Sequence, residues 1–250
     1  MKSVVDSRPY RPALTIACLY LFALLAPVVR ADAPVAKVID GPDGVRVSVK
    51  MIGPVLQTTD LQIICVLKHD PAGDKYVEAM QDFNNKLGSL LSSLRDRGEF
   101  IGEAGETLLF TPPANSIAPK QVLLIGVGDE PALTLDSLRL AGRIAAREAV
   151  RLNAAHVSFA PALRDQGSSR IGVGEGDGAV VEQFLLAYDT ETRLQAQGIA
   201  PRAAIADLTI EAGPKFFDGA MEKVTAAVAS AANQAKRRDS APYRVAATAK

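Results

Sequence analysis

The chain has 250 residues, of which 48% are hydrophobic, so it can bury the core of one sizeable domain and is not disordered throughout. Lysine plus arginine equals aspartate plus glutamate at 28 each, which gives no bulk attraction for nucleic acid or for an anionic membrane surface. Tryptophan is absent and aromatic residues make up only 5%, so binding surfaces that stack sugars or single-stranded nucleic acid are also disfavoured.

Residues 1–31 have the three-part pattern of a secretory signal peptide. Basic residues precede an apolar run over 14–26, and small residues follow it, with the most favourable cleavage position after Ala31. The apolar run is shorter than the roughly 20 residues that a membrane-spanning helix needs, which makes an uncleaved anchor the weaker alternative. The sequence therefore predicts an exported protein, periplasmic or extracellular, that contacts a membrane only through its signal segment during export. Cleavage would leave a small excess of acidic residues, which further disfavours a nucleic-acid partner.

The two cysteines are consistent with export but do not require it. Cys18 belongs to the signal segment, so Cys65 is the lone thiol of the mature chain and no internal disulfide is expected. Cys65 stands in an apolar, β-branched run, where a small buried side chain is favoured over a nucleophile.

The mature chain begins with two predicted strands. Val45, Val47 and Val49 alternate with polar residues, a period of two that is typical of a half-buried strand, which we place at an edge of the sheet. Residues 61–67 are continuously apolar between polar flanks, as expected of a central strand that is covered on both faces.

Helical and strand patterns then alternate. Residues 74–94 carry apolar side chains at spacings of three and four, which predicts a helix that Gly88 breaks or bends. Short apolar strands are expected at 106–110 and 121–125, the first ended by two prolines and the second by a glycine-rich turn.

The second half of the chain continues this alternation. Thr134 is a suitable N-cap for a helix that runs to Leu152. Strands alternating with helices predict one layered α/β domain over 34–240 with a mixed, mostly parallel sheet, followed by a flexible tail at 241–250. The remaining expected elements are a strand at 156–159, a glycine-rich loop at 172–178, a helix at 179–188, a strand at 206–210 and an alanine-rich helix at 217–238.

Side chains for catalysis or metal binding are not evident in the sequence. His69 and His156 have no second histidine, cysteine or carboxylate at metal-ligand spacing, and each is expected to be solvated or hydrogen-bonded locally. The glycine-x-serine-x-glycine pattern of a nucleophile elbow is absent. The acidic pairs Asp129–Glu130 and Glu175–Asp177 stand in expected loops, where exposure is the default. We therefore predict no catalytic residue, no metal site and no cofactor.

Two glycine-rich segments are the candidate ligand-binding sites. Backbone amides at such places can hold an anion, because no side chain blocks its approach. The second segment does not match a dinucleotide-binding fingerprint and carries two acids that would repel phosphate, so a tight or flexible loop is the alternative interpretation. The candidate residues are Gly126, Val127 and Gly128 after one strand, and Gly172, Gly174, Gly176 and Gly178 before the next helix.

Longer stretches of the chain resemble a known family. They include the motif Gly102-Glu103-Ala104-Gly105-Glu106-Thr107 and, after it, an apolar strand that ends in Gly126-Val127-Gly128. Together these parts resemble, in order, the N-terminal domain of the leucine aminopeptidase, or cytosol aminopeptidase, family over 45–242. The parts that carry the resemblance are 94–109, 121–128, a helix started by Gly178 and an alanine-rich segment at 227–242.

The resemblance implies a fold for the chain and also implies that the chain lacks the family's catalytic residues. The family's N-terminal domain has an α/β/α fold similar to macro domains, whereas its two metal ions and its catalytic residues belong to the C-terminal domain. No catalytic residue of the family can therefore be carried over to this sequence. The resemblance implies a non-catalytic interaction or regulatory module that pairs with itself or with a full-length aminopeptidase. Two alternatives stay open, a macro-like binder of a nucleotide or small anion, and a component of a metalloaminopeptidase whose catalytic domain is on another chain.

Overall fold

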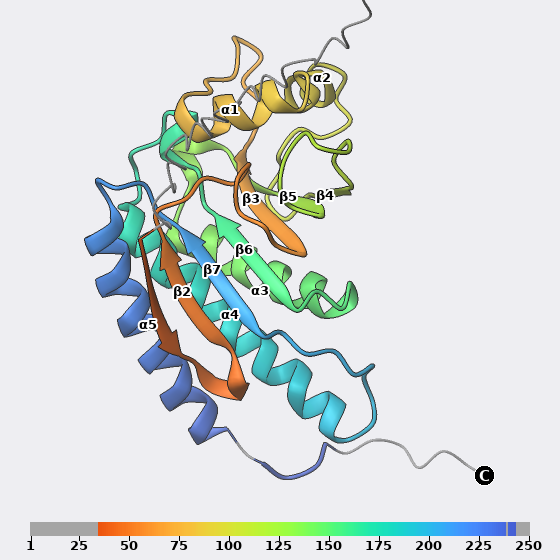
Figure 1. Cartoon of the computed structure of the whole chain (residues 1–250), viewed down its shortest axis with the longest axis vertical. Helices are drawn as coiled ribbons and strands as arrows, with labels where there is room; N and C mark the ends of the chain where they lie inside the picture. The colour runs from red at the N-terminus through yellow and green to blue at the C-terminus, as the bar shows by residue number, and fades with distance from the viewer. Residues whose placement is uncertain (1–34, 239, 244–250) are drawn as a thin grey trace, which may run out of the picture. The chain divides into compact units, whose positions relative to one another are not determined.

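Seven strands form one sheet with the order β1-β2-β7-β6-β3-β5-β4 (Figure 1). The outer strands β1 and β4 run antiparallel to their neighbours, and all pairings between the inner strands are parallel. This arrangement, in a computed structural model that describes residues 35–238 and 240–243, confirms the α/β class and the mixed, mostly parallel sheet. The strands are β1 (Ala36–Asp40), β2 (Arg46–Lys50), β3 (Leu61–Leu67), β4 (Thr107–Phe110), β5 (Gln121–Gly128), β6 (His156–Ala160) and β7 (Asp207–Glu211).

Helices cover the sheet on both faces. α3, α4 and α5 pack on one face, and α1 and α2 pack on the other face over β3 and β5 (Figure 1). Side chains alternate along β3, so that Ile63 and Cys65 belong to the first core while Ile64 and Val66 belong to the second. The predicted three-layer α/β/α architecture is thereby confirmed. The helices are α1 (Glu78–Lys86), α2 (Leu90–Asp96), α3 (Leu135–Arg151), α4 (Val173–Ala196) and α5 (Phe217–Arg237).

Some sequence predictions lie outside the described residues. These are the signal peptide at 1–31, with Cys18, and the last part of the expected tail at 244–250, and they stay predictions. Within the described part of the chain, no helix is long and apolar enough to cross a membrane. Cys65 is buried in the first core, as predicted.

The strand expected at 45–49 is present as β2, but its predicted place at the edge of the sheet is wrong. β1 pairs with it and forms the edge instead. The sequence gives little sign of β1, because all of its residues except the half-buried Ile39 are exposed and no alternation of apolar and polar side chains results. In β2, by contrast, Val47 and Val49 are fully buried in the first core.

Residues 51–60 link β2 to β3 by an irregular crossover in place of a helix. Because the inner strands all run in the same direction, this segment returns from the carboxyl edge of the sheet to the amino edge. Val55 packs with Ile64 in the second core, so the crossover lies on the same face as α1 and α2. Polar side chains of the sheet are also buried, among them Ser158 and Glu211, and the serine hydroxyl donates to the carboxylate at 2.7 Å.

The single helix predicted over 74–94 is two helices. The break falls at Gly88 and Ser89, both with a φ of 63°, so the interruption expected at the glycine is confirmed. The predicted start at residue 74 is wrong. α1 begins only at Glu78, because Asp74 accepts hydrogen bonds from Arg95 and lies outside the helix.

Most other predicted elements are confirmed with small shifts in their ends, as is usual for boundaries read from sequence, but the helix predicted at 179–188 is much longer and runs over Val173–Ala196 as α4. α3 begins after Thr134, whose N–H donates to Ser137 Oγ at 3.4 Å. β6 and β7 each differ from the expected ranges by a residue, and α5 ends at Arg237.

Candidate functional site at the carboxyl edge of the sheet

In open α/β sheets, ligands bind outside the carboxyl ends of the strands, at a point where neighbouring strands send their connections to opposite faces. β3 and β6 form such a point in this chain. β3 continues to α1 on one face of the sheet, and β6 continues to α4 on the other face. Of the glycine segments predicted as binding sites, 126–128 ends β5 and 172–178 comes after β6, so both lie at this same edge.

Gln166 closes the space between the ends of β3 and β6. The two strands pair only as far as Ile64 and Ala160, so the last backbone groups of β3 have no partner on β6. The Leu67 N–H donates to Gln166 Oε1 at 2.9 Å, and Gln166 Nε2 donates to the Cys65 carbonyl at 2.9 Å. The side-chain amide thus continues the hydrogen-bond ladder beyond the last β6 partner of β3.

Gly126, Val127 and Gly128 are the last residues of β5, so the turn predicted at this place is wrong and the strand is longer than expected. A Cβ atom on Gly126 would lie 2.1 Å from the Glu103 carbonyl oxygen, so only glycine allows the 101–106 segment to lie against the strand. The Gly126 N–H donates to the Glu106 carbonyl at 2.8 Å, and the Gly128 N–H donates to the Gly102 carbonyl at 3.0 Å. These two amides are therefore already used within the chain.

The carboxylate of Glu106 occupies a concave group of backbone amides. Its Oε2 atom accepts from the N–H groups of Ile101 at 3.2 Å, Gly102 at 2.7 Å and Glu103 at 2.9 Å. Successive amides that converge in this way are a common cradle for anions. The motif that carries the family resemblance therefore folds into a small anion cradle that holds a carboxylate of its own.

The loop predicted at 172–178 is wrong, because these residues form the N-cap and the first turns of α4. Gly174 and Gly176 are helical and fit against neighbouring helices. A Cβ atom would lie 2.7 Å from the Gly219 carbonyl of α5 for Gly174, and 2.9 Å from Leu138 of α3 for Gly176. Close packing between helices therefore explains these glycines, although their spacing favours a turn when it is considered alone.

Two acids at the start of α4 differ strongly in their surroundings. The Glu175 carboxylate folds back over the N-cap, since a Cβ atom on Gly172 would lie 2.1 Å from Glu175 Oε2. Its negative charge is favourable at the positive end of the helix dipole. Asp177, predicted to be exposed, is fully buried, and neither of its oxygens has a hydrogen-bond partner among the described residues. Burial, together with the charge of Glu175, raises the pKa of Asp177 well above its ordinary value.

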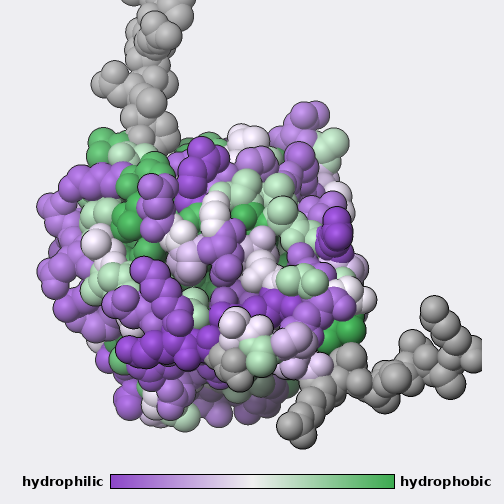
Figure 2. Space-filling model, turned by 90° about the horizontal axis from the view of Figure 1, so that it is seen from below, coloured by the Kyte–Doolittle hydropathy of each residue, from purple (hydrophilic) through white to green (hydrophobic). Residues whose placement is uncertain are grey.

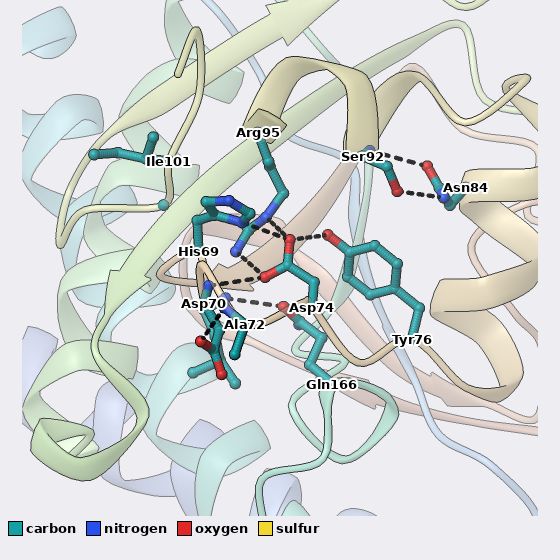
Figure 3. A network of polar contacts seen from close by, with 12 residues as sticks. His69, Asp70, Ala72, Asp74, Tyr76, Asn84, Ser92, Arg95, Ile101 and Gln166 are labelled. Carbon is teal, nitrogen blue, oxygen red and sulfur yellow. Dashed lines mark hydrogen bonds and ion pairs between the residues drawn. The ribbon is translucent and has the colours of Figure 1, made fainter. Parts of the chain in front are cut away.

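Asp74 is the centre of a polar network beside this edge (Figure 3). Arg95 donates to both of its oxygens, from Nε at 2.5 Å and from Nη2 at 2.9 Å, and the side chain of Arg95 is only 1% exposed. His69 Nδ1 lies 2.9 Å from Asp74 Oδ2, and the Tyr76 hydroxyl donates to the same oxygen at 3.3 Å. Burial opposes ionisation, but the hydrogen bonds from Arg95 and His69 outweigh it and lower the pKa of Asp74. The network ties α2 to the segment that follows β3.

Sequence reasoning missed this network, except that His69 was expected to be hydrogen-bonded locally, which is confirmed. Asp74 and Arg95 are distant in sequence and match no motif. The available signal was weak. Arg95 follows Leu91 and Leu94 on the apolar side of α2, where a buried arginine requires an acidic partner.

Two further groups of polar side chains at the carboxyl edge are paired. Lys68 Nζ lies 2.8 Å from Glu103 and 3.8 Å from Asp129, and these acids raise the pKa of the lysine. The Ser168 hydroxyl donates to Glu130 at 2.8 Å. In the described ranges, no group of three or more histidine, cysteine, aspartate or glutamate side chains could hold a metal ion. These charged and polar side chains of the carboxyl edge therefore bind one another in ion pairs and hydrogen bonds.

His156 lies at the opposite, amino edge of the sheet. Its Nδ1 atom is 2.6 Å from the Asp207 carboxylate, so the expected local hydrogen bond is confirmed. Asp60 accepts from the His156 N–H at 2.9 Å and from Lys120 Nζ at 2.7 Å. This cluster joins the starts of β3, β6 and β7 and is not part of the carboxyl edge.

Comparisons with known proteins agree with the fold. A family model described as the N-terminal domain of the cytosol aminopeptidase family matches residues 64–196. A probable cytosol aminopeptidase of Roseiflexus castenholzii is 26% identical over 195 residues, which are 76% of this chain and 36% of that protein. The chain thus spans only about a third of the length of this relative.

Solved structures show the same fold at low sequence identity. A mutant of tomato leucine aminopeptidase aligns with a TM-score of 0.56 and 20% identity, over 78% of this chain and 37% of that enzyme. An Oceanobacillus iheyensis macrodomain with ADP aligns with a TM-score of 0.55 and 10% identity, over 79% of this chain and 99% of that domain. The macro-like character of the α/β/α fold is therefore confirmed.

Proposed function

The chain belongs to the cytosol aminopeptidase family through its N-terminal domain, and we propose that it is an exported, non-catalytic module that acts by binding a protein partner. The partner is a second copy of the chain or a full-length aminopeptidase, which would supply the catalytic domain on another chain. Export, to a periplasmic or extracellular place, is supported by the signal-peptide pattern of residues 1–31.

The observation that carries this proposal is how the carboxyl edge of the sheet is filled. Gln166, which follows β6 in the chain, bonds to the end of β3, Glu106 occupies the converging amides, and Glu175 covers the start of α4. The chain therefore satisfies, with its own side chains, the positions where this class of fold binds ligands. The family match also covers only the N-terminal domain. A surface function explains this combination better than a reaction at the edge.

A peptidase assay tests the non-catalytic part of the proposal. The purified protein is expected to hydrolyse leucine-p-nitroanilide no faster than a blank, with manganese or zinc added. The matched variant replaces Glu103 and Asp129, two exposed acids at the carboxyl edge, by alanine. Turnover that survives removal of contaminating peptidases and disappears in this variant would contradict the proposal, because two-metal hydrolysis needs acidic ligands.

A mixing experiment tests the partner. The chain and the full-length aminopeptidase of the same organism are run together on size exclusion with light scattering, and each protein is run alone as the control. Co-elution at a higher mass, or a dimeric mass for the chain alone, is the expected result. Unchanged elution of both proteins with a monomeric chain would count against a role in protein binding.

A nucleotide or small-anion binder is the second candidate, and it is favoured by the alignment with a macrodomain whose structure holds ADP. Gly126–Gly128 and Gly172–Gly178 stay its predicted site. At the first segment, the Gly126 and Gly128 N–H groups already donate to the Glu106 and Gly102 carbonyls. At the second, an anion would have to displace the carboxylate of Glu175. Because binding to the native state raises the melting temperature, a thermal-shift titration with ADP-ribose and with phosphate separates the two candidates. No shift is expected, and a saturable rise would favour this second function.

A further inference from the structure

Among the described residues, the outer edge of β1 carries backbone hydrogen-bonding groups that have no partner. The Met51 N–H donates to the Val35 carbonyl at 2.9 Å, so every second residue from Val35 onward bonds to β2. In an antiparallel pair, these residues alternate with residues whose N–H and C=O groups point away from the partner strand. Ala36, Val38 and Asp40 therefore direct their backbone groups outward, and Val38 is the central one of the three.

β1 lacks most features that protect exposed sheet edges. Edge strands are usually shielded by proline, by short length or by charges that point outward. β1 has no proline, and the ammonium of Lys37 lies over the Phe217 ring, 5.8 Å from its centroid, which holds this charge against the body of the domain. Val38 is 63% exposed. The opposite edge strand, β4, is shorter and is followed closely by Pro112 and Pro113.

A second copy of the chain fits this edge in a defined register. Two identical strands pair antiparallel about a two-fold axis perpendicular to the sheet, and residues that face each other project to the same side. When Val38 faces Val38 of the second copy, Ala36 faces Asp40. Each of these pairs consists of outward-directed residues, so all of them can exchange N–H to C=O hydrogen bonds. Lys37 then faces Ile39, and no like charges stand opposite each other.

We propose that two copies of this chain pair through β1 and form a sheet that continues across a symmetric dimer centred on Val38. This inference rests on the proposed function and gives self-association a specific surface. The face in Figure 2 is mainly hydrophilic with small, separate hydrophobic patches, so this face offers no large apolar surface for a partner to bury. Pairing at a sheet edge needs no such surface, because backbone hydrogen bonds supply its affinity. A single strand pair buries less than the roughly 1,600 Å² of a standard interface, so the dimer is weak and depends on concentration.

Sedimentation velocity over a concentration series, on protein purified from expression of the full-length chain, tests the proposal. The wild type is expected to show a monomer–dimer equilibrium. Val38→Pro removes an outward N–H that β2 does not use, and Val38→Lys adds a charge at the centre of the pairing. Each is expected to raise the dimer dissociation constant about tenfold or more. Leu56→Lys is the matched control, because Leu56 is 69% exposed on the crossover and not on β1, and its dimer is expected to match the wild type.

Far-UV circular dichroism establishes that each variant is folded, and Val38→Lys provides the test if Val38→Pro does not fold. A wild type that stays monomeric over the whole series overturns the inference. Folded Val38 variants that dimerise as strongly as the Leu56 control also overturn it. If the monomeric wild type still co-elutes with a full-length aminopeptidase, only pairing through β1 is lost. If it does not co-elute, the proposed function fails as well.

Discussion

Among single residues, Glu106 contributes most clearly to the conformation of the family motif. Without its carboxylate, the converging N–H groups of residues 101–103 would lose the acceptor that they share. The backbone of this folded segment in turn bonds to Gly126 and Gly128 at the end of β5. One side chain thus stabilises the contact between the motif and the sheet.

Glu106→Ala is expected to lower the free energy of unfolding by about 2 kcal/mol, because it leaves partly buried amides without an acceptor. Urea unfolding followed by circular dichroism measures this change. Glu103→Ala is the control in the same segment. Its carboxylate is half exposed and, among the described residues, pairs only with Lys68, so its removal is expected to cost less than about 1 kcal/mol. Equal losses in the two variants would show that the amide cradle does not stabilise the fold.

Glu211 makes the stability of the fold dependent on pH. Burial raises its pKa from the ordinary 4.5 to about 7, and hydrogen bonds from Ser158 and Gln62 and the charge of Lys50 oppose this rise only in part. The folded chain therefore keeps a proton that the unfolded chain releases. The stabilisation linked to this proton is complete below about pH 4.5 and is lost as the pH rises to about 7.

Glu211→Gln keeps the shape of the side chain but does not titrate. Between pH 4.5 and 7.5, the wild type is expected to lose about 3 kcal/mol of unfolding free energy relative to this variant, at about 1.4 kcal/mol for each pKa unit. Urea unfolding at a series of pH values gives the difference. Parallel pH profiles for the two proteins would refute the raised pKa of Glu211.

At the scale of elements, the start of α4 shows how packing overrides local preference. Alternating glycines favour a turn when only neighbours in the sequence count, which is why a loop was predicted at 172–178. In the fold, the same residues let α4 approach α5 and α3 more closely than any side chain would allow. The glycines are visible in the sequence, but the helices that pack against them are distant in sequence and cannot be inferred from the local pattern.

Two alanine substitutions separate helix preference from close approach. Gly174→Ala is expected to destabilise the fold by about 1–3 kcal/mol, because its Cβ would overlap the Gly219 carbonyl. Gly219→Ala adds a Cβ with nothing within 4 Å, so it is expected to stabilise α5 by up to about 1 kcal/mol. Thermal unfolding of both variants measures the effects. An increase in stability for Gly174→Ala would mean that α4 and α5 can accept a Cβ at this position and that their close approach does not require the glycine.

The other elements could be predicted where burial restricts the residue types of the element itself, because such a restriction is visible as a pattern in the sequence. Strands such as β3, with its continuous apolar run, were predictable because burial on both faces restricts every residue. β1 was not, since an exposed edge strand restricts hardly any of its side chains. The candidate site was predictable only in its glycines and in the resemblance of its motif. The contacts of Gln166 with β3, and of Asp74 with Arg95, join residues that are far apart in sequence.

For the whole molecule, the shared strands join the two cores into one unit. β3 and β5 give alternate side chains to each core. Ile63 and Ile64 are neighbours on β3 but belong to different cores, so unfolding of one core would disturb the strand that the other core packs on. The layer of α1 and α2 is further tied to the end of β3 by the hydrogen bonds of Asp74 with Arg95 and His69. The helices on one face of the sheet are therefore not expected to unfold while the helices on the other face stay packed.

One cooperative unfolding transition is expected as a result. Tyr76 packs on the second core and Tyr188 is buried in the first, so tyrosine fluorescence follows both, while circular dichroism follows the secondary structure. Phe83→Ala in one core and Phe184→Ala in the other are each expected to lower the unfolding free energy by about 3–5 kcal/mol. In urea, the two signals should still coincide in each variant, with an unchanged slope. A separate early phase in Phe83→Ala would mean that α1 and α2 detach alone and that the sheet does not couple the cores.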